Sequence, residues 1–350
     1  MKNTLEQQLQ HLIASLDNGE KLPSLRKLAD QFNSNILSTQ RCLAKMTASG
    51  QIFTKPRSGF YKAMPIFRKL EILLFDRHII EGEFTFHKYF FNTMVTHLLC
   101  GRRQVRVHLW DHNCKTELLQ GCANPDDSIV LTYRLGPEQL YIEEELRKRR
   151  VPHIHIIPNI RKDLEIGTSI RLDDEETIRK QLDFLLSRGH RRIAGIFTCS
   201  PGQYVRVWEE RLNAFCRLSA QLDLELHPEY LIRLNDPEKD IDDAIAGFRQ
   251  STRPPTAILF GDRYAPFLYQ AIRKNGMEPG REIALLGSND MPWSKMLSPK
   301  LSCIRISPDS LEPHLDALIV AFENGNHPDS VFLEQQIVER ETVCVHLHES

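Results

Sequence analysis

The sequence of 350 residues lacks any apolar run approaching about 18 residues, the length that a helix needs to cross a membrane. It also lacks a secretory signal, because Met1 leads into an amphipathic segment that contains Glu6 and Asp17 instead of an unbroken apolar run. The eight cysteines are scattered and form no Cys-x-x-Cys pair. These absences exclude an integral membrane protein and a disulfide scaffold, and they predict a cytoplasmic protein with reduced thiols.

Signatures of catalysis are missing too. The chain has no Gly-x-Ser-x-Gly elbow, no Gly-x-x-x-x-Gly-Lys phosphate loop and no Gly-x-Gly-x-x-Gly turn. We therefore predict that the protein is not an enzyme and needs no cofactor. Fourteen histidines include three close pairs, but no Cys or His-Glu-x-x-His helix accompanies them: His108 with His112, His153 with His155, and His346 with His348. Strand spacing puts His153 and His155 on one face, which a metal could use, but a structural or solvated role is favoured for all three pairs and no metal is predicted.

Charge is distributed unevenly along the chain. Residues 1–69 contain 11 Lys and Arg against 4 Asp and Glu, a net charge of +7, although the whole chain has a net charge of −1. A basic N-terminal segment attached to an acidic remainder is typical of DNA binding, because displaced counterions supply much of the affinity for phosphates. The simpler alternative, a solvated charged helix face, is less favoured once the order of elements below is considered.

The basic segment has the pattern of two helices and a β-hairpin. Apolar or small side chains recur at helical spacing in two stretches: Leu25, Leu28, Ala29 and Phe32, then Thr39, Cys42, Leu43 and Met46. The opposite face of the second stretch is mostly polar: Leu37, Ser38, Gln40, Arg41, Ala44 and Lys45. Gly50 ends the second helix, and residues 51–63 predict two strands around a cationic tip at 55–59.

Residues 22–63 resemble the winged helix-turn-helix of the GntR family of bacterial repressors. The shared marks are Leu22-Pro23-Ser24, Arg26, Leu28-Ala29, Arg41, Leu43, Gly50 and Pro56 with Ser58-Gly59. The resemblance implies these DNA contacts: Arg26, Ser38, Gln40, Arg41, Lys45, Lys55, Arg57, Ser58 and Gly59. Ile36 and Gln40 stand where the family usually has Arg, so a Gln40 that reaches a base edge would read adenine instead of guanine.

From about Lys69 short apolar strands alternate with helices, which predicts parallel sheets covered on both faces. The predicted strands are 72–75, 105–110, 128–132, 153–157, 192–197, 230–233, 257–260, 283–286 and 301–306. The predicted helices are 88–99, 137–149, 174–187, 208–221, 241–250, 264–275 and 309–324. Their number and a break near Pro158 indicate two lobes, with a ligand beyond the carboxyl ends of the strands.

The predicted fold class is therefore α/β: an N-terminal winged helix-turn-helix (1–63), a linker (64–69) and a two-lobed domain (70–350). Lobe 1 is expected at about 70–158 and 294–325, and lobe 2 at about 159–293 and 326–346. Five blocks of the larger domain resemble the periplasmic-binding-protein-like effector domain of the LacI family: 169–176 with 185–196, 210–215, 254–262, 283–290 and 297–306. Within them Gly189 predicts a helix stop in the left-handed conformation, followed directly by a strand.

That resemblance implies a small-molecule effector between the lobes. Arg211 takes the place of a ligand-contacting Arg, Asp262 that of the usual Asp, and Asn289 that of another Asp. Gly261 replaces the Asn that the family has before Asp262. Aromatic residues near strand ends are candidates for the apolar walls of the site, with core packing as the alternative for each: Phe84, Phe86, Trp110, Tyr133, Trp208 and Trp293.

The sequence thus predicts a homodimeric transcriptional regulator that binds double-stranded operator DNA and a sugar or sugar derivative, as a repressor of carbohydrate-utilisation genes. Because Gly261 and Asn289 depart from the family pattern, a regulator without ligand response is one alternative. A sugar-binding protein that serves a transporter and an enzyme with two α/β lobes are weaker alternatives. The former lacks an export signal and the latter lacks catalytic signatures.

Overall fold

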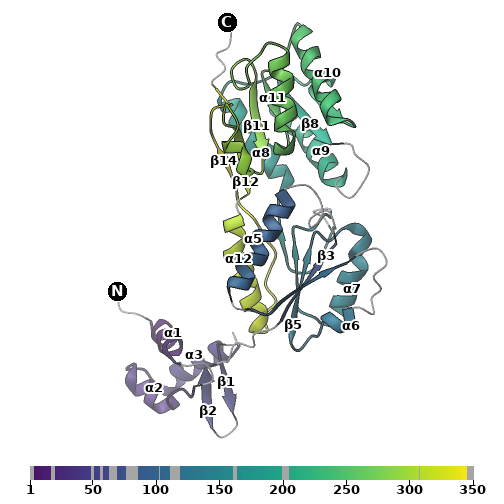
Figure 1. Ribbon diagram of the computed structural model, residues 1–350. Helices are drawn as coiled ribbons and strands as arrows, with labels where there is room; N and C mark the ends of the chain where they lie inside the picture. The colour runs from purple at the N-terminus through teal and green to yellow at the C-terminus, as the bar shows by residue number, and fades with distance from the viewer. Residues whose placement is uncertain are drawn as a thin grey trace.

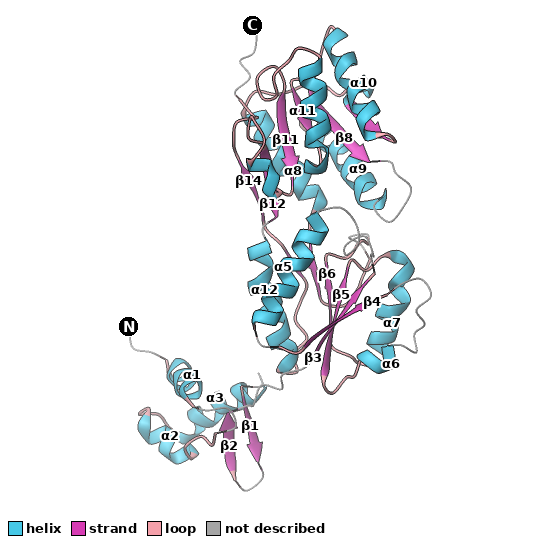
Figure 2. Ribbon diagram, viewed as in Figure 1, coloured by secondary structure: helices cyan, strands magenta, loops and turns pink. Residues whose placement is uncertain are grey.

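The computed structural model describes residues 4–16, 20–48, 51–55, 58–62, 69–75, 86–101, 103–110, 119–160, 164–198, 205–306 and 308–344. They form a small N-terminal unit and a larger domain of two lobes, each built on a six-stranded sheet (Figure 1). Helices flank strands throughout the larger domain, as Figure 2 shows. Within these ranges, no helix combines the length and the apolar character that a membrane span requires.

The N-terminal unit consists of three helices followed by two antiparallel strands: α1 (Leu5–Ser15), α2 (Leu25–Gln31), α3 (Ile36–Ala48), β1 (Ile52–Lys55) and β2 (Gly59–Lys62). Side chains cap each helix start. Thr4 forms a capping box with Gln7, the Ser24 hydroxyl accepts a hydrogen bond from the Lys27 N–H, and Asn35 Oδ1 accepts one from the Ser38 N–H at 2.7 Å. The observed order matches the order that the sequence predicts for residues 22–63.

One apolar core holds this unit together. Leu9 of α1, Leu28 of α2 and Leu43 of α3 are fully buried against one another, because each lies on the apolar stripe of its helix. Lys62 at the end of β2 donates hydrogen bonds from Nζ to the carbonyl oxygens of Leu16 (2.6 Å) and Ala14 (3.2 Å). This cation satisfies carbonyls at the negative end of α1 and ties the hairpin to that helix.

Lobe 1 contains a fully parallel sheet in the order β13-β7-β6-β5-β3-β4. Its strands are β3 (Lys69–Leu74), β4 (Val105–Leu109), β5 (Ser128–Tyr133), β6 (His153–Ile156), β7 (Ser169–Arg171) and β13 (Val331–Phe332). Helices α5 (Phe86–Cys100) and α12 (Pro308–Glu323) cover one face, and α6 (Leu119–Cys122) and α7 (Leu140–Lys148) cover the other (Figure 1). Every residue of the central strand β5 is buried, as expected of a parallel strand covered on both faces.

Lobe 2 contains the sheet β14-β12-β11-β10-β8-β9, parallel except for β14. Its strands are β8 (Ile193–Thr198), β9 (Leu231–Leu234), β10 (Ala257–Leu259), β11 (Ala284–Ser288), β12 (Ser302–Ile306) and β14 (Gln335–Val338). Its helices are α8 (Asp174–Ser187), α9 (Val205–Gln221), α10 (Pro237–Gln250) and α11 (Ala265–Lys274). The bounds of α8 are those predicted, and Gly189 has the expected left-handed φ of 88° just after the helix.

The lobes divide at other positions than the sequence predicts. Strand β7, expected in lobe 2 because it follows Pro158, pairs with β6 in lobe 1. Strand β12, expected in lobe 1 because it falls within 294–325, pairs with β11 in lobe 2. The break near Pro158 was misread as a lobe boundary because the chain continues to one more lobe 1 strand, where Ile170 is fully buried in the same core.

Three strands were not predicted: β7, β13 and β14. They are two to four residues long, and their pattern is weak because each lies at or near the edge of its sheet. Several predicted features lie outside the described residues or side chains: Gly50, Pro56, Arg57, the linker 64–68, Phe84, and the side chains of Lys55 and Trp208.

Candidate functional sites on helix α3 and between the lobes

Helix α3 presents an exposed polar face away from the core of the N-terminal unit. Thr39 and Leu43 are fully buried, whereas Gln40 and Arg41 are exposed. The predicted faces of this helix are therefore those observed. Lys45 is also exposed and forms a weak surface ion pair with Glu6 of α1, with 3.5 Å between Nζ and Oε2.

Other predicted DNA contacts surround this face. Arg26 is exposed in the first turn of α2, and Ser38 is half-buried at the start of α3. At the hairpin, Gly59 has a φ of 115°, a conformation that glycine adopts readily, and Ser58 shares a hydrogen bond of 2.5 Å with the Tyr61 hydroxyl. Two apolar side chains at the start of α3, Ile36 and Leu37, are 48% and 59% exposed, so the face is not purely polar.

Arg211 of α9 is buried at 7% exposure, and its Nε donates a hydrogen bond of 2.6 Å to Oδ1 of Asp174 at the start of α8. Its guanidinium is therefore held by lobe 2. Its charge also acts on lobe 1, because it lowers the pKa of His87 in α5. Arg211 of lobe 2 therefore lies close enough to lobe 1 for its charge to reach His87, while its role as a ligand contact stays a prediction.

His87 and Arg134 belong to the same place but were not predicted. Burial, together with the charges of Arg134 and Arg211, holds the pKa of His87 well below its ordinary value, so its imidazole is neutral at pH 7. Arg134 directly follows β5, is 7% exposed and has a φ of 63°, which is unusual for a residue with a side chain. Its position after a buried strand is the signal that sequence reasoning missed. His87, at the start of a helix, has no such signal.

The aromatic candidates fall into two groups. Phe86, Tyr133 and Trp293 belong to or pack against the same lobe 1 core, so the structure brings them together. The Tyr133 hydroxyl donates a hydrogen bond to the backbone carbonyl of His87 at 3.0 Å, which links this aromatic group to His87. Trp110 is separate: it is buried in the cluster on the other face of the sheet, beside α6 and α7.

Asp262, at the start of a single turn after β10, is 1% exposed. Its Oδ2 accepts hydrogen bonds from the Met291 N–H (3.0 Å) and the Ser294 hydroxyl (2.9 Å). Burial raises its pKa to about 7, an effect that these hydrogen bonds only partly offset. In this structure Asp262 holds the segment after β11 from inside lobe 2, and it shares no hydrogen bond with Arg211 among the described contacts.

The segment after β11 begins with two residues in left-handed conformation, Asn289 (φ 80°) and Asp290 (φ 49°). The Asn289 backbone N–H donates to the carbonyl of Ile304 at 2.7 Å. Asp290 forms ion pairs with Arg305 (2.6 Å) and Arg340 (2.7 Å). The carboxylate next to Asn289 is therefore occupied by lobe 2 arginines, which the sequence did not indicate.

Comparisons with known proteins agree with this architecture. Residues 182–343 match the family model of a periplasmic binding protein-like domain. The arabinose metabolism transcriptional repressor of Geobacillus stearothermophilus is 23% identical over 306 residues, which cover 82% of this chain and 80% of that protein.

Solved structures show the same fold. A regulatory protein of the LacI family from Chloroflexus aggregans aligns with a TM-score of 0.64 and 19% identity, over 80% of this chain and 100% of that chain. The lac repressor dimer bound to operator and the anti-inducer ONPF aligns with a TM-score of 0.61 and 17% identity, over 79% of this chain and 94% of that chain. The predicted α/β fold with two lobes is confirmed, while the resemblance of residues 22–63 to the GntR family stays a prediction. The larger part of this chain therefore has the fold of LacI-family regulators, and residues 182–343 within it match the periplasmic binding protein-like family model.

Proposed function

We propose that this protein is a ligand-responsive transcriptional regulator that binds operator DNA and is not an enzyme. The observation that carries the proposal is the combination, in one chain, of a helix with an exposed polar face and a two-lobed ligand-binding fold. The similarity to an arabinose metabolism repressor supports a repressor of carbohydrate-utilisation genes.

At the DNA end, residues 1–63 act as a winged helix-turn-helix of the GntR type. The antiparallel hairpin β1–β2 directly after α3 supports this type, because such a hairpin serves as the wing. In this proposal Gln40 and Arg41 reach base edges or phosphates in the major groove, and Gly59 allows the hairpin to approach the backbone. Arg26, Ser38 and the basic tip of the hairpin contribute phosphate contacts.

At the effector end, a sugar or sugar derivative binds where the lobes meet, beyond the carboxyl ends of the parallel strands. Arg211 supplies a polar contact from lobe 2, and the cluster of Phe86, Tyr133 and Trp293 supplies apolar walls. The positive charges of Arg134 and Arg211 both lower the pKa of His87, which is neutral. This cationic setting favours a sugar derivative that carries an acidic group.

We propose these domain limits, which the sheets support: 1–63 for the DNA-binding unit, 69–171 with 308–332 for lobe 1, and 174–306 with 335–344 for lobe 2. The chain acts as a homodimer in this proposal, since one α3 reads only half of a palindromic site. The lac repressor structure, a dimer on its operator, supports this arrangement through its common fold. The two lobes can adopt different relative arrangements in this proposal. A ligand shifts the affinity for DNA only if its own affinity differs between these arrangements.

Binding of the full chain to the DNA upstream of its own gene, measured by fluorescence anisotropy, tests the DNA end. Arg41→Ala should weaken binding by about 1–3 kcal/mol, and Gln40→Ala should relax base preference at one position of the site. Arg249→Ala, at the end of α10 in lobe 2, is the matched control and should leave affinity unchanged. An equal loss of DNA affinity in Arg41→Ala and Arg249→Ala would contradict the proposal. Binding without preference for any DNA sequence would contradict it as well.

The ligand response is tested by repeating the titration with pentoses, hexoses and their acids and phosphates. Arg211→Ala should abolish the response and keep affinity for DNA. Arg217→Ala is its matched control, because Arg217 lies on the same helix and pairs with Glu175 as Arg211 pairs with Asp174. A constitutive DNA-binding protein is the second candidate, favoured because Arg211 already pairs with Asp174 and Asp290 already pairs with Arg340. An unchanged affinity with every compound would support that candidate.

A further inference from the structure

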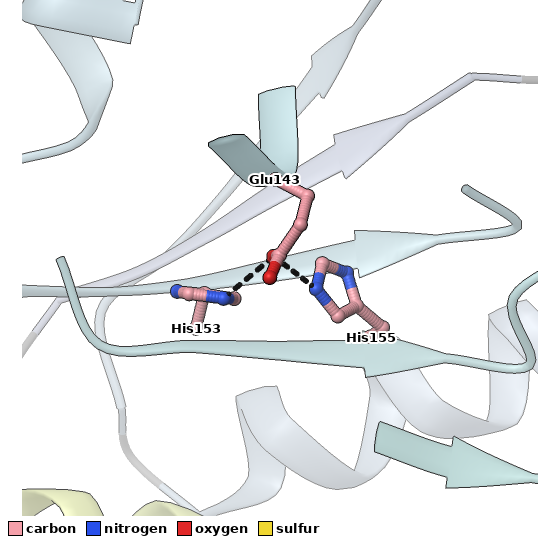
Figure 3. Close-up of side chains that lie close together, drawn as sticks. All are labelled: Glu143, His153 and His155. Carbon is pink, nitrogen blue, oxygen red and sulfur yellow. Dashed lines mark hydrogen bonds and ion pairs between the residues drawn. The ribbon is translucent and has the colours of Figure 1, made fainter. Parts of the chain in front are cut away.

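Three ionisable side chains that the proposed function leaves unused converge inside lobe 1, as Figure 3 shows. Glu143 projects from α7 towards His153 and His155, which share one face of β6 because their positions differ by two. Nε2 of His153 lies 2.8 Å from Oε2 of Glu143, and Nε2 of His155 lies 2.7 Å from the same oxygen. One ligand atom from each residue lies within 4.8 Å of the other two.

The hydrogen bonds of His153 determine which of its nitrogens faces the carboxylate. Nδ1 lies 2.7 Å from the carbonyl oxygen of Val151, an acceptor, so Nδ1 carries the ring proton. In the neutral ring, Nε2 then directs a lone pair at the negatively charged Oε2 of Glu143, and this buried nitrogen has no other polar partner among the described residues. Two electron-rich atoms at this distance require a cation or an additional proton between them.

The surroundings orient all three side chains. Nδ1 of His155 shares a hydrogen bond of 2.6 Å with the Thr132 hydroxyl, and Oε1 of Glu143 accepts from the Gly167 N–H at 2.9 Å. Such outer contacts hold the ligands of metal sites in place. A Cβ atom on Gly167 would lie 2.5 Å from Nε2 of His153, so the absence of a side chain there keeps this nitrogen accessible.

We propose that Glu143, His153 and His155 bind one divalent transition-metal ion of the zinc class. Two imidazole nitrogens and one carboxylate oxygen form a donor set that such ions prefer, with a fourth position left for water. Metal–ligand bonds of about 2.0–2.1 Å in tetrahedral geometry separate ligand atoms by roughly 3.3 Å, so the present contacts must lengthen by about 0.5 Å.

A residue that contacts the proposed site lines a surface pocket, and an ion in the site would have a structural consequence. Arg147, which donates to Oε1 of Glu143, also lines a surface pocket of about 380 Å³ with Glu165 and Arg171. A bound ion would join α7, β6 and the segment before β7, after which the chain crosses to lobe 2 at residues 172–173. The ion would therefore stiffen lobe 1 next to residues 172–173, where the chain passes to lobe 2.

Other histidines provide the comparison that the test needs. His108 lies 2.6 Å from Glu71 on neighbouring strands of the same sheet, and His97 contacts Glu312 and Asp316, but each of these sites contains a single imidazole. His112, His346 and His348 lie outside the described residues. His108→Gln is therefore a matched control that removes a histidine–glutamate pair without touching the proposed site.

The experiment uses the full chain without a histidine tag, treated with EDTA and then desalted. Co²⁺ is titrated at pH 7.5 while its visible absorption is recorded, since protein-bound Co²⁺ in a tetrahedral site absorbs far more strongly than the hydrated ion. Saturation at one equivalent and displacement by Zn²⁺ are expected. His153→Gln should weaken binding at least about tenfold, whereas His108→Gln should bind as the wild type does.

Glu143→Gln is the second variant, because it keeps the shape of the side chain and removes its charge. Circular dichroism of each variant in EDTA shows whether it folds, and His153→Gln decides the matter if Glu143→Gln does not. No saturable binding would overturn the proposal and leave an additional proton as the cation. Equal binding by His153→Gln and the wild type, or equal loss in His108→Gln, would overturn it as well, because the ion would then bind elsewhere.

Discussion

Glu143 in lobe 1 and Asp262 in lobe 2 are both buried carboxylates, and their acidities are shifted in opposite directions. In lobe 2, burial raises the pKa of Asp262 to about 7, although a backbone N–H and a hydroxyl donate to it. In lobe 1, burial alone would also raise the pKa of Glu143, but hydrogen bonds and charges of His153 and His155 lower it well below its ordinary range.

The difference shows which partners offset the loss of water around a buried charge. Neutral donors stabilise the ionised form of Asp262 only in part, so this residue is near its midpoint of protonation at pH 7. Groups that can carry positive charge surround Glu143, including Arg147 at 2.7 Å, and they keep it ionised. Removing these two carboxylates should therefore have opposite effects on stability.

Glu143→Ala should have the largest effect, a loss of about 3–5 kcal/mol in the free energy of unfolding. The truncation leaves the imidazole of His155 and the N–H of Gly167 without their buried acceptor. Urea unfolding in EDTA, followed by circular dichroism, measures the loss. Glu144→Ala, on the exposed side of the same helix, is the control and should change stability by less than about 0.5 kcal/mol. A loss below about 1 kcal/mol for Glu143→Ala would show that the cluster is not held by its carboxylate.

Asp262→Asn should stabilise the protein at pH 8, by about 4 kcal/mol at most, since the pKa rises from 3.8 to about 7. Between these two values the folded state binds more protons than the unfolded state, so this carboxyl makes the free energy of unfolding fall as pH increases. An Asn carbonyl can accept the same two hydrogen bonds without a charge.

Urea midpoints from pH 4 to pH 8 test this dependence. The Asp262→Asn variant should lose the part of the slope that Asp262 causes, while Asp242→Asn, whose half-buried carboxylate pairs with Lys274, should keep it. Identical slopes for the Asp262 variant and the wild type would mean that the carboxyl is hydrated and ionises normally.

Gly287→Ala should cost about 1–3 kcal/mol, because it overpacks the site around Asp262. A Cβ at position 287 would lie 2.2 Å from Oδ1 of Asp262 and 3.0 Å from Cδ2 of Leu301. Gly247→Ala, in α10 with no atom within 4 Å of the new Cβ, should instead stabilise by about 0.5–1 kcal/mol. Thermal unfolding of the two variants should show midpoints displaced in opposite directions. A neutral Gly287→Ala would indicate that Asp262 moves freely.

Glu6→Gln should have the smallest effect, within about 0.5 kcal/mol of the wild type. The Glu6 side chain is 46% exposed and its partner Lys45 is 71% exposed, so water screens both charges. Chemical unfolding at low and high salt measures this contribution, and Gln10→Glu at an exposed position of the same helix serves as a reference for an added exposed charge. A loss above about 1 kcal/mol would indicate that the pair couples α1 to α3 more strongly than an exposed ion pair does.

Local pattern was sufficient to predict most of the elements. The stripe of Leu25, Leu28 and Ala29 predicted α2, and the apolar run at 128–132 predicted the central strand β5, because burial on one or both faces imposes a period on the sequence. The exposed positions of Gln40 and Arg41 follow from the same periodicity.

Periodicity could not assign strands to sheets or charges to partners. Nothing local distinguishes β7 and β12 from strands of the opposite lobes, since pairing depends on which core buries Ile170 or Cys303. The role of Arg211 as a ligand contact stays a prediction, and its pairing with Asp174, 37 positions away, was not foreseen.

The sequence by itself determined a basic helical unit followed by an α/β domain with two parallel sheets. The net charge of a segment and the periodicity of its hydrophobic residues depend on residues that are close in sequence, so both can be determined without a structure. The tertiary structure alone decided the environment of each buried charge: Asp262 among neutral donors, Glu143 between two imidazoles. These environments bring together residues from separate elements, and the energy of a buried charge depends on its distance to every such neighbour.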